Sequence, residues 1–173
     1  MVDFLRDSVE DAATWRTEIT ELRARGKSPD NGERRAALGR LGDLLRVGGR
    51  TNEAIPALEQ ALHLARRAGD VRGVRANRVR LAIARQYANE HDAARAALEA
   101  LVAEIDGDDD KAYLDYAVQH LGKVYAEREE WDRAVACLRR ALDLRHGTPT
   151  ATSSQTALNA ALAARDHFGE STT

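Results

Sequence analysis

Apolar residues recur along most of the chain at spacings of three and four residues. Leu38, Leu41 and Leu45 give one clear example. This spacing places apolar side chains on one face of an α-helix, whereas a half-buried β-strand would alternate at every second residue. The pattern therefore predicts amphipathic helices and an all-α fold.

The helical pattern repeats with a period of 40 residues. Equivalent packing positions are Leu41, Leu81 and Leu121, then Gly42, Ala82 and Gly122, then Ala54, Ala94 and Ala134, and finally Leu58, Leu98 and Leu138. A fixed period of this length is typical of helical repeat proteins, in which each unit packs on its neighbours.

Polar residues that favour helix N-termini recur in two phases of the same period. One phase holds Asp30, Asp70 and Asp110, and the other holds Asn52, Asp92 and Asp132. A side-chain oxygen at such a position accepts a hydrogen bond from an otherwise unpaired backbone N–H. Each unit is thus predicted to contain two helices, an A helix at 31–48, 71–88 and 111–128, and a B helix at 53–68, 93–105 and 133–145.

The small residue in the A helix and the alanines in the B helix allow the two helices to approach closely. The third unit shows the full set as Leu121-Gly122, Tyr125, Ala134, Leu138 and Ala141. This set resembles the tetratricopeptide repeat (TPR) family over about residues 31–168. The usual unit of that family has about 34 residues, so the longer period indicates a long-helix variant. The resemblance implies a right-handed α–α superhelix, a TPR-like solenoid of about eight helices that binds a partner and is not an enzyme.

The ends of the chain complete the predicted single domain over 1–173. An apolar stripe predicts a helix at 3–25 that packs on the first repeat; it consists of Leu5, Val9, Ala12, Trp15, Ile19 and Leu22. The repeats are placed at 30–69, 70–109 and 110–149. A capping helix is expected at 150–168, because the end of a repeat array needs a helix with one polar face. Residues 169–173 are expected to be a disordered tail.

In the TPR family the A helices line a concave groove, and the resemblance implies that the corresponding face binds the partner here. Residues displaced around the A helices from their packing positions are Arg40, Asp43, Arg46, Val79, Arg80, Ile83, Gln86, Tyr87, Tyr116, Gln119, His120 and Lys123. These twelve residues form the predicted partner-binding groove.

The second repeat departs from the pattern. Arg78 and Arg85 occupy phases that are apolar in the other repeats, while Ala76, Val79, Ile83 and Tyr87 form an apolar stripe. Under one interpretation the stripe lies in the groove and receives a partner's side chains. Under the other the helix is rotated, so that the stripe belongs to the core and the arginines are solvated.

Charge is unevenly distributed, although the net charge is only -2. Residues 34–85 carry 12 basic and 4 acidic side chains, and residues 86–130 carry the reverse. This asymmetry predicts a partner of opposite polarity, salt-sensitive self-association, or a solvated dipole without a partner. The Arg-rich region at 66–85 raises nucleic-acid binding as an alternative, which the few aromatic residues make less favourable.

Residues that carry chemistry are sparse. The single cysteine, Cys137, and the five histidines show no metal-ligand spacing. Asp106, Asp108 and Asp110 resemble the start of a calcium loop, but Lys111 stands where that loop needs glycine. We therefore predict no metal, no cofactor and no enzymatic activity.

The composition predicts a cytoplasmic protein. No segment approaches the roughly 18 to 20 apolar residues that a membrane span needs, and the acidic N-terminus is unlike a signal peptide. The excess of Arg over Lys and the abundance of Ala fit a high-GC bacterial genome. The predicted function is a scaffold or adaptor for a peptide or partner helix, with a nucleic-acid-associated module or a self-associating module as alternatives.

Overall fold

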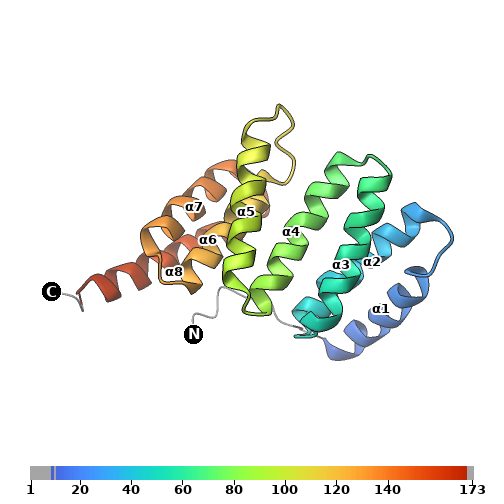
Figure 1. The fold of residues 1–173 in the computed structure, drawn as a ribbon. Coiled ribbons are helices and arrows are strands. Elements are labelled where there is room, and N and C mark those ends of the chain that lie inside the picture. The colour runs from blue at the N-terminus through green and yellow to red at the C-terminus, as the bar shows by residue number, and fades with distance from the viewer. Residues whose placement is uncertain (1–8, 10, 171–173) are drawn as a thin grey trace. The chain divides into compact units, whose positions relative to one another are not determined.

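Eight α-helices make up the part of the chain that the computed structural model describes, which is residue 9 and residues 11–170, with side chains described as far as residue 167. They are α1 (Ala12–Arg25), α2 (Asn31–Val47), α3 (Thr51–Arg67), α4 (Val71–Tyr87), α5 (His91–Asp106), α6 (Leu114–Glu127), α7 (Trp131–Leu144) and α8 (Ala151–Glu170) (Figure 1). These residues contain no β-strand. The predicted all-α helical repeat fold is confirmed.

The helices belong to two compact units. One unit contains α1–α4 and ends at Glu90, and the other begins at His91 and contains α5–α8. The boundary falls between the A and B helices of the second predicted repeat, which is the repeat that carries Arg78 and Arg85 at otherwise apolar phases. Each unit has a core cluster of its own.

The core of the α1–α4 unit forms around the close pair of α2 and α3. Leu41, Leu45 and Leu58 are buried in it, and Leu81 of α4 joins them. Gly42 lies directly against Leu58, so that a Cβ atom at residue 42 would overlap the leucine side chain. The small residue that recurs in the sequence therefore determines how closely the A and B helices pack.

Helix α1 is attached to this unit by apolar and polar contacts. Ile19 and Leu22 are buried in the core cluster. The indole Nε1 of Trp15 donates a hydrogen bond to the Leu44 carbonyl at 2.8 Å, and its ring lies against Gly48. The predicted packing of the N-terminal helix on the first A helix is thus seen for the described part of that helix.

The α5–α8 unit repeats the arrangement at α6, its first A helix. Gly122 of α6 lies against Leu138 of α7. A Cβ atom at residue 122 would lie only 2.8 Å from the Cγ atom of Leu138. Leu138 also belongs to the cluster that α7 shares with Leu158 and Ala161 of α8. Helix α8, which continues the A phase of the repeat, therefore packs on α7 through apolar contacts.

The A helices begin where their caps predict in two of three cases. The Asp30 carboxylate accepts a hydrogen bond from the Glu33 N–H at 2.7 Å, and Asp70 accepts one from Gly73 at 2.8 Å. Asp110 instead accepts from the Ala112 N–H at 3.0 Å. Tyr113 then takes a left-handed conformation with φ of 70°, so α6 starts at Leu114 and not at residue 111.

The B helices start two residues earlier than predicted. A left-handed residue ends each preceding turn at the same phase, namely Gly49, Asn89 and Glu129, and the helix follows almost at once. Asn52, Asp92 and Asp132 consequently lie in the first helical turn and do not serve as N-caps. Negative charge in this turn is still favourable, because it faces the positive end of the helix dipole.

The predicted helix at 3–25 is shorter in the described residues. The Asp11 carboxylate accepts a hydrogen bond from the Ala13 N–H at 2.9 Å and caps α1, which begins at Ala12. Residues 3–8 and 10 of the predicted helix lie outside the described residues. At the other end α8 extends to Glu170, past the predicted end at 168, and residues 171–173 of the expected tail lie outside the described residues.

Candidate partner-binding surfaces

An ion pair joins the two A helices of the α1–α4 unit. Arg80 of α4 donates from Nε to Oδ2 of Asp43 on α2 at 2.9 Å. Gly39 makes room for this contact, since a Cβ atom there would lie 3.1 Å from Arg80 Nη1 and 3.2 Å from Asn77 Oδ1. The predicted groove residues Asp43 and Arg80 are therefore brought together, and they bind each other.

Burial is the largest influence on the Asp43 carboxyl and raises its pKa above the ordinary value. Arg80 and Arg46 act in the opposite direction and lower the pKa, but they do not offset the burial. This arrangement holds the Arg80 guanidinium in one position on the A-helix face. Asp43 is thus a positioning group for Arg80.

The other two predicted cations of α2 also have neighbours within the unit. Arg40 is exposed and donates from Nε to Oε1 of Glu18 on α1 at 2.8 Å. The Arg46 guanidinium lies 4.6 Å from the centre of the Tyr87 ring, which is within the range of a cation–π contact. Arg40 is the most accessible of the predicted groove cations, but it too is paired.

The apolar stripe of α4 is largely withdrawn from solvent. Ala76, Val79 and Ile83 are buried, and Tyr87 is half-buried beneath Arg46. Gln86, a further predicted groove residue, is completely buried. These burials leave Arg40, Asp43, Arg80 and Tyr87 as the solvent-accessible part of the predicted set in this unit.

On α6 the predicted residues divide in the same way. Gln119, His120 and Lys123 are buried, whereas Tyr116 is 43% exposed. The Tyr116 ring lies 4.5 Å from the Arg145 guanidinium carbon, measured to the ring centre. Tyr116 is thus an exposed aromatic side chain whose ring is held by a buried cation.

Arg145, directly after α7, is the centre of a polar cluster that joins α6 to α8. It is 2% exposed and donates from Nε to Asp115 Oδ2 at 2.7 Å. Its Nη1 donates to Gln119 Oε1 and, at 3.2 Å, to Ser154 Oγ. The Ser154 hydroxyl in turn donates to Gln119 Oε1 at 2.6 Å. The cluster fixes the start of α8 against α6.

Sequence reasoning missed this cluster, although one signal was present. Asp115 and Gln119 are four residues apart and therefore share a face of α6. A buried arginine needs such acceptors. Arg145 follows the last apolar positions of its helix, however, and nothing local distinguishes it from a solvated arginine at a helix C-terminus.

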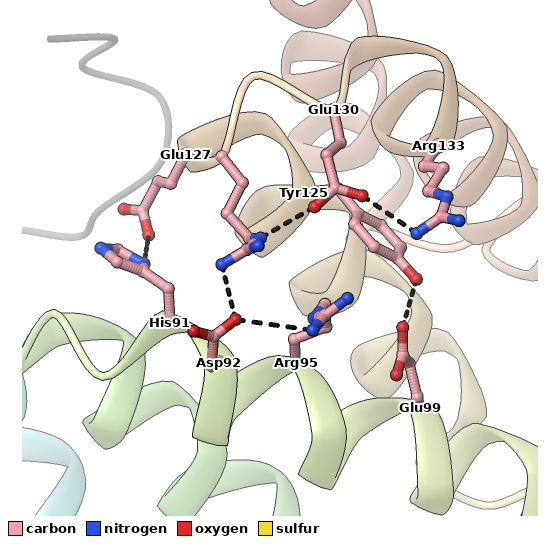
Figure 2. Close-up of polar contacts among 9 residues, drawn as sticks. His91, Asp92, Arg95, Glu99, Tyr125, Glu127, Glu130 and Arg133 are labelled. Atoms are coloured by element: carbon pink, nitrogen blue, oxygen red, sulfur yellow. Dashed lines mark hydrogen bonds and ion pairs between the residues drawn. The ribbon is translucent and has the colours of Figure 1, made fainter.

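A second polar network joins α5 to the turn between α6 and α7 (Figure 2). Arg128 donates to Asp92 at 2.7 Å and to Glu130 at 2.8 Å, and Arg133 donates to Glu130 at 3.0 Å. Beside them His91 Nδ1 lies 3.1 Å from Glu127 Oε2. The network uses Asp92, which the sequence had placed as a helix cap, as a link between helices.

Tyr125 lies at the edge of this network and points its phenol towards Glu99 (Figure 2). The hydroxyl donates to Glu99 Oε1 at 2.6 Å. Burial is the largest cause and, together with Glu99, raises the pKa of Tyr125 to about 12. Burial also raises the pKa of the half-buried Cys137 thiol, which is the opposite of the shift that activates a nucleophilic cysteine.

The arginines of the Arg-rich region at 66–85 differ in their surroundings. Arg75 is 1% exposed and Arg80 is bonded to Asp43, so neither presents its charge freely to a phosphate. Arg66 and Arg67 are exposed at the end of α3 and contact no acceptor among the described residues. Nucleic-acid binding by this region stays a prediction.

The α1–α4 unit also contains a cavity of about 610 Å³. It lies along the solvent-facing side of α3 and is also bordered by the first turn of α2. The lining residues are Pro56, Glu59, Gln60, His63, Leu64 and Arg67 of α3, with Asn31 and Arg34 of α2. The predicted groove residues do not line it. The cavity is thus separate from the A-helix face.

No group of three or more His, Cys, Asp or Glu side chains within the described residues is placed to hold a metal ion. None of their helices is long and apolar enough to cross a membrane.

Comparison with known proteins agrees with the repeat architecture. A family model described as tetratricopeptide repeat matches residues 37–72 and 117–152. The first match begins in α2 and covers α3, and the second begins in α6 and covers α7. Among curated proteins, none matches the chain.

A solved structure supports the fold. The chain is similar to a candidate kinesin light chain from Podosopora anserina with nearly identical TPR-like repeats, at 18% identity and a TM-score of 0.59. The similarity covers 94% of this chain and 92% of that one. The two matched repeats and the A–B helix packing at Gly42 and Gly122 agree with this fold, a TPR-like helical repeat.

Proposed function

We propose that the protein is a scaffold or adaptor that binds a peptide or partner helix through the exposed faces of its A helices. Tetratricopeptide repeats generally mediate protein–protein interactions, and the family is generally not enzymatic. The predicted groove residues belong to A helices of both units, α2 and α4 in one and α6 in the other. Each unit is proposed to offer its own A-helix face.

The observation that carries this proposal is the exposed ring of Tyr116. Tyrosine is enriched among the residues that dominate binding energy at interfaces, because it combines a large apolar area with few rotatable bonds. The Tyr116 ring is 43% exposed. Arg145 lies beneath it and is itself held by Asp115. The Tyr116 side chain is already held in place, so little of its conformational entropy is lost when a partner covers the ring.

In the α1–α4 unit the proposed contacts are polar. Asp43 holds the Arg80 guanidinium, and Glu18 holds that of Arg40. Arginine held in this way can still receive a carboxylate of the partner at its remaining N–H groups.

The test compares two exposed apolar side chains of equal accessibility on different helix types. Tyr116 on the A helix α6 is 43% exposed, and Leu144 at the end of the B helix α7 is 42% exposed. Proteins captured by the wild type are identified by mass spectrometry, and direct affinity for the captured partner is then measured. Tyr116→Ala is expected to weaken that affinity at least about tenfold, which corresponds to about 1.4 kcal/mol, while Leu144→Ala leaves it unchanged.

Thermal unfolding of both variants accompanies the binding measurement. Equal affinity of Tyr116→Ala and the wild type for every captured partner would refute the assignment of the A-helix face. A loss of affinity in Leu144→Ala alone would assign binding to the opposite helix type.

A further inference from the structure

The cavity beside α3 is lined by basic side chains that are not paired within the described part of the fold. Arg34, His63 and Arg67 line it, and none of them makes a side-chain hydrogen bond or ion pair within the described residues. The adjacent Arg35, by contrast, forms an ion pair with Asp70 at 3.0 Å. The Asp70 carboxylate is thus paired with Arg35 and not with Arg34.

Among these side chains, Arg34 gives the clearest evidence for a ligand. Its Nε atom is buried and has no hydrogen-bond partner among the described residues. A buried guanidinium N–H without an acceptor is costly, because it loses its hydrogen bond to water and gains none in return. An acceptor that enters the cavity would recover that loss.

The charge of the lining favours an anionic occupant. Glu59 is the one acidic residue in it within the described part of the chain, and Arg85 of α4 lies 4.0 Å away from that carboxylate. Two arginines therefore outnumber this carboxylate in the lining. The guanidinium fork matches the geometry of a carboxylate or another oxyanion.

The shape and the remaining lining indicate more than a free ion. The volume of about 610 Å³ falls within the range of about 300–1,000 Å³ that is typical of ligand-binding sites. Leu64 and Pro56 add apolar surface along the same face of α3. Among the described residues no Phe, Tyr or Trp lines the cavity, whereas single-stranded nucleic acid is usually bound by stacking on aromatic rings.

We propose that this cavity is a second binding site, which takes an acidic peptide segment of a partner protein. Carboxylates of the segment pair with Arg34 and Arg67, and an apolar side chain of the segment packs on Leu64. The site lies on the outward face of a B helix and goes beyond the A-helix binding proposed above. A partner could thus engage the protein at two separate surfaces.

The test uses peptide probes of defined charge. A fluorescein-labelled hexapeptide of sequence Glu-Asp-Leu-Asp-Glu-Leu is titrated with the full chain, and fluorescence polarisation reports binding. The matched probe Gln-Asn-Leu-Asn-Gln-Leu has the same size without the charge. The expected result is saturable binding of the acidic probe and none of the neutral probe.

Three variants with the same change of charge locate the site. Arg34→Gln and Arg67→Gln are each expected to lower affinity about tenfold, as the loss of one charge-assisted hydrogen bond implies. Arg66→Gln is the control, because Arg66 neighbours Arg67 and is exposed but does not line the cavity. Its affinity is expected to stay within about twofold of the wild type.

Several results would overturn the proposal. These are no saturable binding by the wild type at millimolar protein, an equal loss in the Arg66→Gln control, or equal binding of the neutral probe. Displacement of the acidic probe by equimolar inorganic phosphate would also overturn it, since the site would then hold an oxyanion and no peptide. Tyr116→Ala is expected to leave probe binding unchanged, so failure here is distinguishable from failure of the A-helix proposal.

Discussion

Replacing Arg145 by methionine is expected to destabilise the α5–α8 unit strongly. Methionine keeps most of the length of the side chain but removes every N–H group. The loss includes a charge-assisted bond to Asp115 at 2.7 Å and bonds to Gln119 and Ser154. One hydrogen bond to a charged group contributes about 1.5–3 kcal/mol, and removing a partner of a buried pair costs about 3–5 kcal/mol.

Two features lower the estimate for this cluster. Asp115 is 27% exposed, so water partly solvates the carboxylate after Arg145 is removed. Gln119 Oε1 keeps the hydrogen bond from Ser154 at 2.6 Å. We therefore expect a loss of about 3 kcal/mol in the free energy of unfolding. For a chain of this size that corresponds to a fall in Tm of roughly 6–12 °C.

Urea denaturation followed by circular dichroism measures the loss, and hydrogen exchange locates it. Amides at the start of α8 should exchange faster in Arg145→Met, because the cluster joins this helix to α6. Arg139→Met is the control, since Arg139 is exposed on α7 and has no polar partner among the described side chains. It should change stability by no more than about 0.5 kcal/mol. Equal stability of the two variants, or unchanged exchange in α8, would refute the reasoning.

Three further predictions rest on packing and on shifted pKa values. Gly42→Ala should lower the free energy of unfolding by about 1 kcal/mol or more, because its methyl group overlaps Leu58. Gly107→Ala, whose nearest neighbour would be 3.6 Å away, should be nearly neutral in the same urea titration. Tyr125 titrates near 12 in the folded state and near 10 when unfolded, so stability falls as the pH rises from about 10 to 12. Tyr125→Phe should lack this dependence, and a phenol midpoint near 10 by absorbance at 295 nm in the folded wild type would contradict it. The Cys137 thiol should react more slowly with a disulfide reagent at pH 8 than in urea, and equal rates would contradict its burial.

The fold was predictable because its determinants are local and recur. Asp30 and Asp70 mark the starts of α2 and α4 through bonds to residues only three positions away. Gly42 and Gly122 mark the close approach of A and B helices at the same phase of the repeat. Threefold recurrence separated these signals from the chance occurrence of common residues.

The positions of the polar side chains were less predictable, since they depend on contacts between distant residues. Arg145 bonds to Gln119, 26 residues away along the chain, and Ser154 bonds to Gln119 across 35 residues. The helical phase gives the face on which a residue lies but not the side chain that reaches it from another helix. The same limit applies to Asp92, whose residue type suits a cap and whose bond is to Arg128, 36 residues away.

The position of a residue around an A helix also does not show whether its charge is already paired within the fold. The helical phase selected Arg40 and Arg80 because they lie on the A-helix face, and both form ion pairs within their own unit. A partner that binds them gains only what exceeds these existing contacts. Arg34 and Arg67 lie off that face and have no acceptor among the described residues, so a carboxylate there displaces no existing ion pair. The charges that contribute most to recognition are therefore expected outside the A-helix face, at the proposed site beside α3.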